Sequence, residues 1–285
     1  MRQLAAACAL AAAASAEAAS ALPGPQPAAY AVAVNGKITE SRAAHVPRQP
    51  ASLAKLATAL VLLERFPADS PEFREGIVAA GREAAAERGA RLGLRAADRV
   101  PLHDLFAAMI AGSANDACRA LVEHASRGDA AAFVDEMNRL AAAIGMVETR
   151  FADPCGHDRA GQHTSAADLV ILAHAALARP AIVDAARRPF VQVRPLGSGR
   201  LLTVSNTNAL LGRYHGAFGL KTGYTAQAGG CVIGAARLGR TTVVVVILGS
   251  ANRWYQAVGL MNRAFEEALP MPRGRTPETL YLPDD

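Results

Sequence analysis

Lysine is scarce in this chain of 285 residues. Lys37, Lys55 and Lys221 are the only lysines among 30 basic side chains, which leaves 27 Arg. An Arg is almost never deprotonated, whereas burial can tune a Lys into a base. Because the chain uses Arg where it needs only positive charge, each retained Lys calls for a reason beyond its charge.

Cysteine is scarce as well. Besides Cys8 in the N-terminal apolar stretch, the chain contains Cys118, Cys155 and Cys231. An odd number excludes a complete disulfide framework, although one pair can form in an oxidising compartment. No Cys has a neighbouring His or Cys that indicates a catalytic or metal-binding role. We therefore expect these three to be buried small hydrophobic residues.

Clustered metal ligands are also absent from the sequence. Its seven His are dispersed, and the closest pair, His157 and His163, lacks the carboxylate of an H-E-x-x-H pattern. This excludes a zinc peptidase, and we expect neither a metal nor a cofactor. The Arg residues are scattered rather than clustered, so the positive charge does not indicate binding of nucleic acid.

The N-terminal apolar stretch is too short to cross a membrane. It runs from Leu4 to Ala14, follows Arg2, and leads into the small residues Ala14-Ser15-Ala16. A bilayer span needs about 20 apolar residues, whereas this pattern is typical of a secretory signal peptide. We expect a signal peptide over residues 1–20, a Pro-rich lead-in over 21–29, and a periplasmic or secreted protein.

The hydrophobic content is sufficient for a folded core. Hydrophobic residues make up 51% of the chain, although 65 of them are Ala. Together with the modest net charge of +5, this argues against disorder. The length suits one large domain or two small ones.

The apolar pattern divides the chain into strands, helices, strands and a last helix. Tyr30–Val34 alternates into Asn35-Gly36, which predicts a hairpin. The pattern is mostly helical from about Ser52 to Leu177, and Leu53, Leu56, Leu60 and Leu63 share one face of the first helix. Further helices are expected at 102–110, 115–124, 130–144 and 166–177, strands at 190–193, 201–204, 229–235 and 241–248, and a last helix at 252–269.

This order predicts an α+β fold. The N-terminal hairpin and the C-terminal strands would form one antiparallel sheet, which the last helix covers, and the middle helices would form an all-helical lobe beside it. A site is expected in a cleft between the two parts.

The first candidate motif is Ser52-Leu53-Ala54-Lys55. Positions i and i+3 of a helix share a face, so the Ser52 hydroxyl and the Lys55 amine can meet. A Ser hydroxyl becomes nucleophilic when an adjacent base removes its proton, and a Lys shielded from water can act as that base. The alternative is a surface Lys on an amphipathic helix, but Lys55 has apolar neighbours.

Two further motifs carry polar groups at element boundaries. Ser113-Ala114-Asn115 lies between two expected helices, where its side chains either cap a helix or face a cleft. Lys221-Thr222-Gly223 lies in an expected strand, where the Gly allows the close approach of a substrate backbone. The alternative for Lys221 is an exposed charge on an edge strand.

In this order the three motifs are typical of serine β-lactamases and penicillin-binding proteins. The sequence resembles the D-alanyl-D-alanine carboxypeptidases, the low-molecular-mass penicillin-binding proteins, from about Tyr30 to Leu269. The likeness includes residues 50–59, 112–118, 208–211 and 219–225. It implies a serine D,D-peptidase catalytic domain over residues 30–269, followed by a short polar tail over 270–285.

The resemblance also implies roles for individual residues. Ser52 would be the acylated nucleophile, Lys55 its general base, and Ser113 a proton relay. The substrate-binding residues would be Asn115, Lys221, Thr222, Gly223, Tyr224 and Arg253. The oxyanion hole would be formed by the backbone N–H groups of Ser52 and Tyr224. The implied partners are peptidoglycan stem peptides and, as covalent inhibitors, β-lactams.

The sequence departs from the family pattern in two places. The tail lacks a basic amphipathic helix, so no stable membrane anchor is expected, and the loop Asp153–His157 is only roughly similar to that of the family. D,D-endopeptidase activity on cross-links stays open beside carboxypeptidase activity. A class A β-lactamase would need a Glu in an E-x-x-L-N setting, which Glu148 does not provide. A non-catalytic peptidoglycan-binding domain would need a broken motif, and all three are intact.

Overall fold

The computed structural model describes residues 26–269. The expected signal peptide, the first residues of the lead-in and the polar tail lie outside this range. In chain order the elements are β1 (Ala29–Val34), β2 (Lys37–Arg42), the 3-10 turn η1 (Ala51–Ala54), α1 (Lys55–Arg65), α2 (Pro71–Glu75), β3 (Ile77–Ala79), α3 (Arg82–Ala86), β4 (Arg99–Pro101), α4 (Leu102–Ala111), α5 (Asn115–Ser126), α6 (Ala130–Ala143), α7 (Ala166–Leu177), α8 (Pro180–Arg187), β5 (Phe190–Val193), β6 (Leu202–Ser205), β7 (Ala217–Thr225), β8 (Gly229–Leu238), β9 (Thr241–Ser250) and α9 (Arg253–Ala268).

The main sheet joins the two ends of the described chain. Its order is β2-β1-β9-β8-β7, and every neighbouring pair is antiparallel. The β1–β2 turn has positive φ at both Asn35 and Gly36, as a type I′ hairpin turn requires. The expected antiparallel sheet of N- and C-terminal segments is therefore confirmed.

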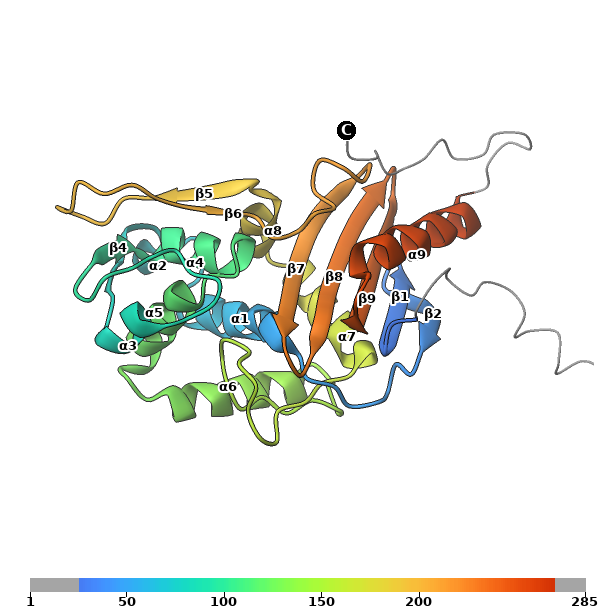
Figure 1. The fold of residues 1–285 in the computed structure, drawn as a ribbon, viewed down its shortest axis with the longest axis horizontal. Helices are drawn as coiled ribbons and strands as arrows, with labels where there is room; N and C mark the ends of the chain where they lie inside the picture. Colours follow the sequence, from blue (N-terminus) through green and yellow to red (C-terminus); the bar gives the residue numbers. More distant parts are fainter. Residues whose placement is uncertain (1–25, 270–285) are drawn as a thin grey trace, which may run out of the picture.

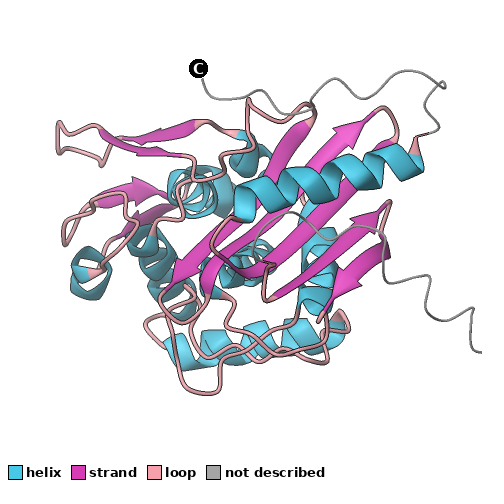
Figure 2. Ribbon diagram, turned by 45° about the vertical axis from the view of Figure 1, so that its right-hand side comes forward, coloured by secondary structure: helices cyan, strands magenta, loops and turns pink. Residues whose placement is uncertain are grey.

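Helices cover both faces of this sheet. On one face, Leu260, Met261 and Phe265 of α9 pack against apolar side chains of β1, β8 and β9. Figure 2 shows α9 lying across that face. On the opposite face, α7 packs on β1 and β9, and α8 packs on β7. The α+β class and the position of the last helix are both confirmed.

A helical lobe from α1 to α6 lies beside the sheet (Figure 1). Its centre is α1, whose residues from Lys55 to Leu63 are all buried. The sequence predicts one apolar face for this helix, but the side chains on its other faces, such as Ala57, Thr58 and Val61, are also buried. The reason is position: α1 contacts α4, α5, α6 and α7, so no face of it remains for solvent.

The middle region is less uniformly helical than its pattern predicts. The short strands β3 and β4 pair within it, with Val78 opposite Val100. Ser52 lies on the 3-10 turn η1, and α1 begins only at Lys55. An unpredicted helix, α8, precedes the paired strands β5 and β6.

Within residues 26–269, no single helix has both the length and the apolar character of a membrane span. The helices α7 and α8 reach that length and character only as a pair, and this pair is bent by 99°.

Candidate active site

The 3-10 turn η1 brings Ser52 and Lys55 together. The Nζ of Lys55 donates a hydrogen bond of 2.9 Å to the Oγ of Ser52. In a 3-10 helix, side chains at i and i+3 are eclipsed, so they superimpose more directly than in an α-helix. The contact expected from the S-x-x-K spacing is therefore present, with a tighter local geometry than the α-helix that the sequence predicts.

Lys55 is enclosed by protein atoms and by three oxygen acceptors. Besides Ser52, its Nζ donates to the Oδ1 of Asn115 at 2.8 Å and to the backbone carbonyl of Cys155 at 2.5 Å. The side chain is fully buried. The interpretation of Lys55 as a surface lysine is wrong.

Burial also changes the acidity of Lys55. Desolvation lowers its pKa from 10.5 to about 7, although the carboxylates of Asp153 and Glu87 act in the opposite direction. Burial disfavours the charged ammonium, and nearby negative charge favours it. At neutral pH a large fraction of the molecules therefore holds Lys55 as an amine that can accept a proton.

Ser113 and Asn115 lie at the turn between α4 and α5. The N-cap of α5 is Ala114 and has no side-chain capping bond, so the capping interpretation of this motif is wrong. Asn115 instead links Lys55 to the backbone, because its Nδ2 donates to the Arg88 carbonyl at 2.7 Å. Ser113 is buried with φ of +58°, a left-handed conformation that costs about 1 kcal/mol or more for a residue with a Cβ.

Lys221 and Thr222 lie on β7, the strand at the edge of the main sheet. Lys221 is buried, and its Nζ donates to the Thr222 carbonyl at 2.9 Å. Burial, followed by the positive charges of Lys55 and Arg253, lowers the pKa of Lys221 well below its ordinary value. The interpretation of an exposed edge charge is therefore wrong, because the Lys221 side chain is buried and near enough to Lys55 for the two charges to interact.

Gly223 allows β7 to approach η1, the turn that carries Ser52. A Cβ on Gly223 would come within 2.9 Å of the Ala51 Cβ and 3.0 Å of the Ser52 backbone nitrogen. Gly156 packs against the same turn, and a Cβ there would come within 2.0 Å of the Ala51 carbonyl oxygen. From the sequence, the Gly of K-T-G is expected to allow the close approach of a substrate backbone. The structure shows a further reason why this position is a Gly, which is the close packing of β7 on η1.

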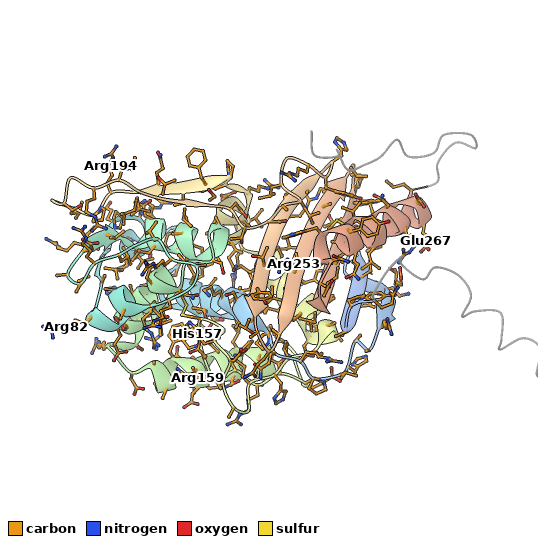
Figure 3. All side chains as sticks on the ribbon, viewed as in Figure 1. Arg82, His157, Arg159, Arg194, Arg253 and Glu267 are labelled. Carbon is orange, nitrogen blue, oxygen red and sulfur yellow. A yellow bond between two sulfur atoms is a disulfide. The ribbon has the colours of Figure 1, made fainter. Side chains whose placement is uncertain are left out.

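Arg253 joins the site from the first residue of α9. Its Nη1 donates to the Gly223 carbonyl at 3.1 Å, and its guanidinium stacks over the Trp254 ring. Figure 3 shows Arg253 in front of the strands of the main sheet. The Nε of Arg253 is buried without a hydrogen-bond partner among the described residues. Arg253, one of the expected substrate-binding residues, therefore lies beside the K-T-G segment. Tyr224, the next residue of β7, is 70% exposed.

A disulfide is the main feature that the sequence does not predict. Cys118 on α5 is bonded to Cys155 in the loop after α6, and only Cys231 is a free buried cysteine among the described residues. The expectation of three unpaired cysteines is wrong for Cys118 and Cys155. The alternative that one pair forms is correct, and the signal available in the sequence was an expected export to an oxidising compartment.

Two carboxylates that act on Lys55 were also missed. His157 connects them, since its Nδ1 lies 3.1 Å from Asp153 and its Nε2 lies 3.3 Å from Glu87. Glu87 also pairs with Arg119 at 3.0 Å. No motif marks these residues, because they lie on α5, on the loop after α6 and just after α3.

Comparison with known proteins gives one family. The family model described as D-alanyl-D-alanine carboxypeptidase matches residues 25–252. The chain is 33% identical over 224 residues to the D-alanyl-D-alanine carboxypeptidase DacD of Escherichia coli, covering 75% of this chain and 55% of the relative. It is 29% identical over 221 residues to a D-alanyl-D-alanine endopeptidase of Pseudomonas aeruginosa, covering 77% and 69%. The chain spans between 55% and 61% of the length of three such carboxypeptidases.

Solved structures agree with the family model. The D-alanyl-D-alanine carboxypeptidase of Mycobacterium tuberculosis superposes with a TM-score of 0.78 at 27% identity, over 90% of this chain and 96% of the other. Penicillin-binding protein D2 of Listeria monocytogenes in the ampicillin-bound form superposes with a TM-score of 0.72 at 30% identity, over 84% and 98%. This chain belongs to the D-alanyl-D-alanine carboxypeptidase family of penicillin-binding proteins.

Proposed function

We propose that this protein is a serine D,D-carboxypeptidase that removes the terminal D-Ala from peptidoglycan stem peptides through an acyl-enzyme on Ser52. The observation that carries the proposal is the 2.9 Å contact between the Ser52 hydroxyl and a fully buried Lys55. Because the pKa of Lys55 is about 7, this amine can take the hydroxyl proton at neutral pH.

In the acylation step, the Ser52 oxygen forms a bond to the carbonyl carbon of the penultimate D-Ala while Lys55 accepts the Ser52 proton. The C–N bond to the terminal D-Ala then breaks, and the leaving amine receives a proton. Water attacks the ester and restores the Ser52 hydroxyl. The backbone N–H groups of Ser52 and Tyr224 would stabilise the oxyanion in both steps.

A group of positive and polar side chains would bind the substrate on the β7 side. Lys221 and Arg253 supply the positive charge that attracts the terminal carboxylate, and Thr222 would hold it by a hydrogen bond. A carboxylate bound beside Lys221 would raise its lowered pKa and favour the charged form. On the helical side, Asn115 would bind a peptide amide of the substrate, and the Ser113 hydroxyl would relay the proton to the leaving group.

Export to the periplasm or the medium is part of the proposal. The expected signal peptide covers residues 1–20, outside the described range. The Cys118–Cys155 disulfide supports export, because disulfides persist in oxidising compartments and are rare in the cytosol. Peptidoglycan lies in the same compartment.

D,D-endopeptidase activity is the second candidate. It is favoured by the similarity to the Pseudomonas protein named D-alanyl-D-alanine endopeptidase. Both activities use the same acyl-enzyme and differ in the leaving group, which is either free D-Ala or the side-chain amine of a second peptide.

A fluorescent penicillin tests the mechanism, and peptides separate the two activities. We expect covalent labelling of the wild type and none of Ser52→Ala; equal labelling of both proteins would contradict an acyl-enzyme on Ser52. A pentapeptide and cross-linked muropeptides are then incubated with the enzyme and followed by mass. Loss of one D-Ala supports the carboxypeptidase, scission of the cross-link supports the endopeptidase, and neither product would contradict both.

A further inference from the structure

The loop that follows α6 contacts the proposed base directly. The Cys155 carbonyl accepts the 2.5 Å hydrogen bond from Lys55, and the preceding Pro154 carbonyl accepts a 2.5 Å bond from Thr58, one turn further along α1. Both contacts are made by backbone atoms. The position of Lys55 therefore depends on where this stretch of main chain lies, not on the type of side chain that it carries.

The same loop also supports the nucleophile. Gly156 adopts φ of +84°, and its Cα packs so closely on η1 that an added Cβ would be 2.9 Å from the Ser52 nitrogen. The Asp153 carboxylate organises the loop from within, since its Oδ1 accepts from the backbone nitrogens of Cys155 and His157. Residues 153–157 thus lie directly behind both Ser52 and Lys55.

The disulfide joins this loop to α5, the helix that carries another acceptor of the Lys55 amine. Cys118 is on α5, three residues after Asn115, whose Oδ1 accepts the 2.8 Å bond from Lys55. The disulfide therefore covalently links the two segments that provide the Asn115 Oδ1 and the Cys155 carbonyl to Lys55.

We propose that the Cys118–Cys155 disulfide is a positioning element for Lys55, holding the Cys155 carbonyl on the Lys55 amine and the loop 153–157 against η1. The inference rests on the proposed function, in which Lys55 is the base. In this role, Cys118 and Cys155 act on Lys55 and do not touch the substrate. Without the tether, the loop can move away from α1 and water can reach the amine.

The number of lysines makes this proposal directly measurable. A protein with three Lys side chains gives three signals when lysine is labelled at its Cε carbon, and their titration is read by NMR. Lys37, exposed on β2, provides the reference signal. Cys118→Ala removes the tether and leaves the residue type at position 155 unchanged. We expect the pKa of Lys55 to rise, since water entry removes part of the desolvation, which is the largest cause of its lowering and outweighs the opposite effect of moving the Asp153 carboxylate away; Glu87 is not on the loop.

The same variant is followed by penicillin acylation as a function of pH. We expect acylation at pH 7 to be about 10-fold slower, because a base with a raised pKa is mostly protonated there, and the midpoint of the profile to shift to higher pH. Cys231→Ser, at the free buried cysteine, is the matched control and keeps the wild-type titration and rate. The double variant C118S/C155S retains nearly the volume of both side chains and repeats the test where the cavity of Cys118→Ala prevents folding.

Identical Lys55 titrations in Cys231→Ser and in the folded tether variants would overturn the proposal. A slower acylation rate with an unchanged midpoint of the pH profile would also overturn the proposal, because a smaller folded fraction by itself gives that result. The NMR titration does not require activity. A wild type that is not acylated would contradict the proposed function, while the Lys55 signal would still report whether the disulfide positions the amine.

Discussion

A Cβ on Gly223 would come within 3.0 Å of the backbone nitrogen of Ser52. The last residue of the K-T-G segment and Ser52 are therefore in direct packing contact. This relationship places Lys221 and Thr222 on the strand that borders Ser52, so the geometry of the third motif depends on that of the first.

Gly223→Ala is expected to slow acylation by penicillin by about 10- to 100-fold. The added methyl displaces either η1 or β7, and misplacing reacting groups by about 1 Å changes a rate by about this factor. Stopped-flow or gel-based labelling measures the rate. Gly239→Ala is the control: its Cβ would meet no atom within 4 Å, and its φ is +57°. It should lower the unfolding midpoint without changing the rate, and an unchanged rate in Gly223→Ala would contradict the packing argument.

Acylation is expected to rise with pH and to level off above about 7. The pKa of Lys55 is lowered to about 7, first of all by burial, and only the unprotonated amine accepts the Ser52 proton. The rate is therefore lost as the pH falls through this value. The pH dependence of penicillin labelling measures it, and a midpoint near the ordinary Lys value of 10.5 would show that Lys55 is not the base.

Lys55→Arg is expected to reduce acylation by at least about 100-fold although it keeps the positive charge. An Arg stays protonated and cannot act as a base, and general-base catalysis contributes about 10²- to 10⁴-fold. Lys37→Arg, the same substitution at an exposed position of β2, is expected to label like the wild type. Retained labelling of Lys55→Arg would assign the proton transfer to another group.

Arg253→Met is expected to lower kcat/KM for a D-Ala–D-Ala peptide by about 10-fold or more, since a charge-assisted hydrogen bond to the terminal carboxylate is lost. The matched control is Arg263→Met. Arg263 is also partly buried on α9 but donates to Glu40 at 2.8 Å, away from β7. If both variants lose the same activity, the effect of Arg253 lies in the stability of α9 and not in substrate binding.

Asp116→Ala is expected to destabilise the fold by about 3 kcal/mol or more. The buried carboxylate accepts hydrogen bonds from the backbone nitrogens of Leu92, Gly93 and Leu94 at 2.7 to 3.0 Å, and bonds to a charged acceptor contribute about 1.5–3 kcal/mol each. Asp129→Ala removes an exposed N-cap of α6 and should cost about 1 kcal/mol. Urea unfolding measures the free energy of unfolding of both variants. An equal loss of stability in both would contradict the prediction that the buried Asp116 carboxylate stabilises residues 92–94.

The sequence by itself determined the elements and the chemical groups of the site. Strand alternation and helical spacing are local properties, so they predicted the N-terminal hairpin, the C-terminal strands, the last helix and the antiparallel sheet. The three motifs predicted Ser52, Lys55, Ser113, Asn115, Lys221 and Thr222 as site residues because their order is typical of serine β-lactamases and penicillin-binding proteins.

Tertiary structure decided how these groups are tuned. Asn115 and Cys155 meet Lys55 across 60 and 100 residues of sequence, and no local pattern carries such a contact. Desolvation, which lowers the pKa of Lys55, is the combined effect of every element packed around α1. The Cys118–Cys155 bond depends on the distance between α5 and the loop after α6, and the need for Gly223 depends on how closely β7 packs on η1. The sequence therefore specified that a lysine stands at this position, and only the packing of distant segments lowered its pKa to about 7.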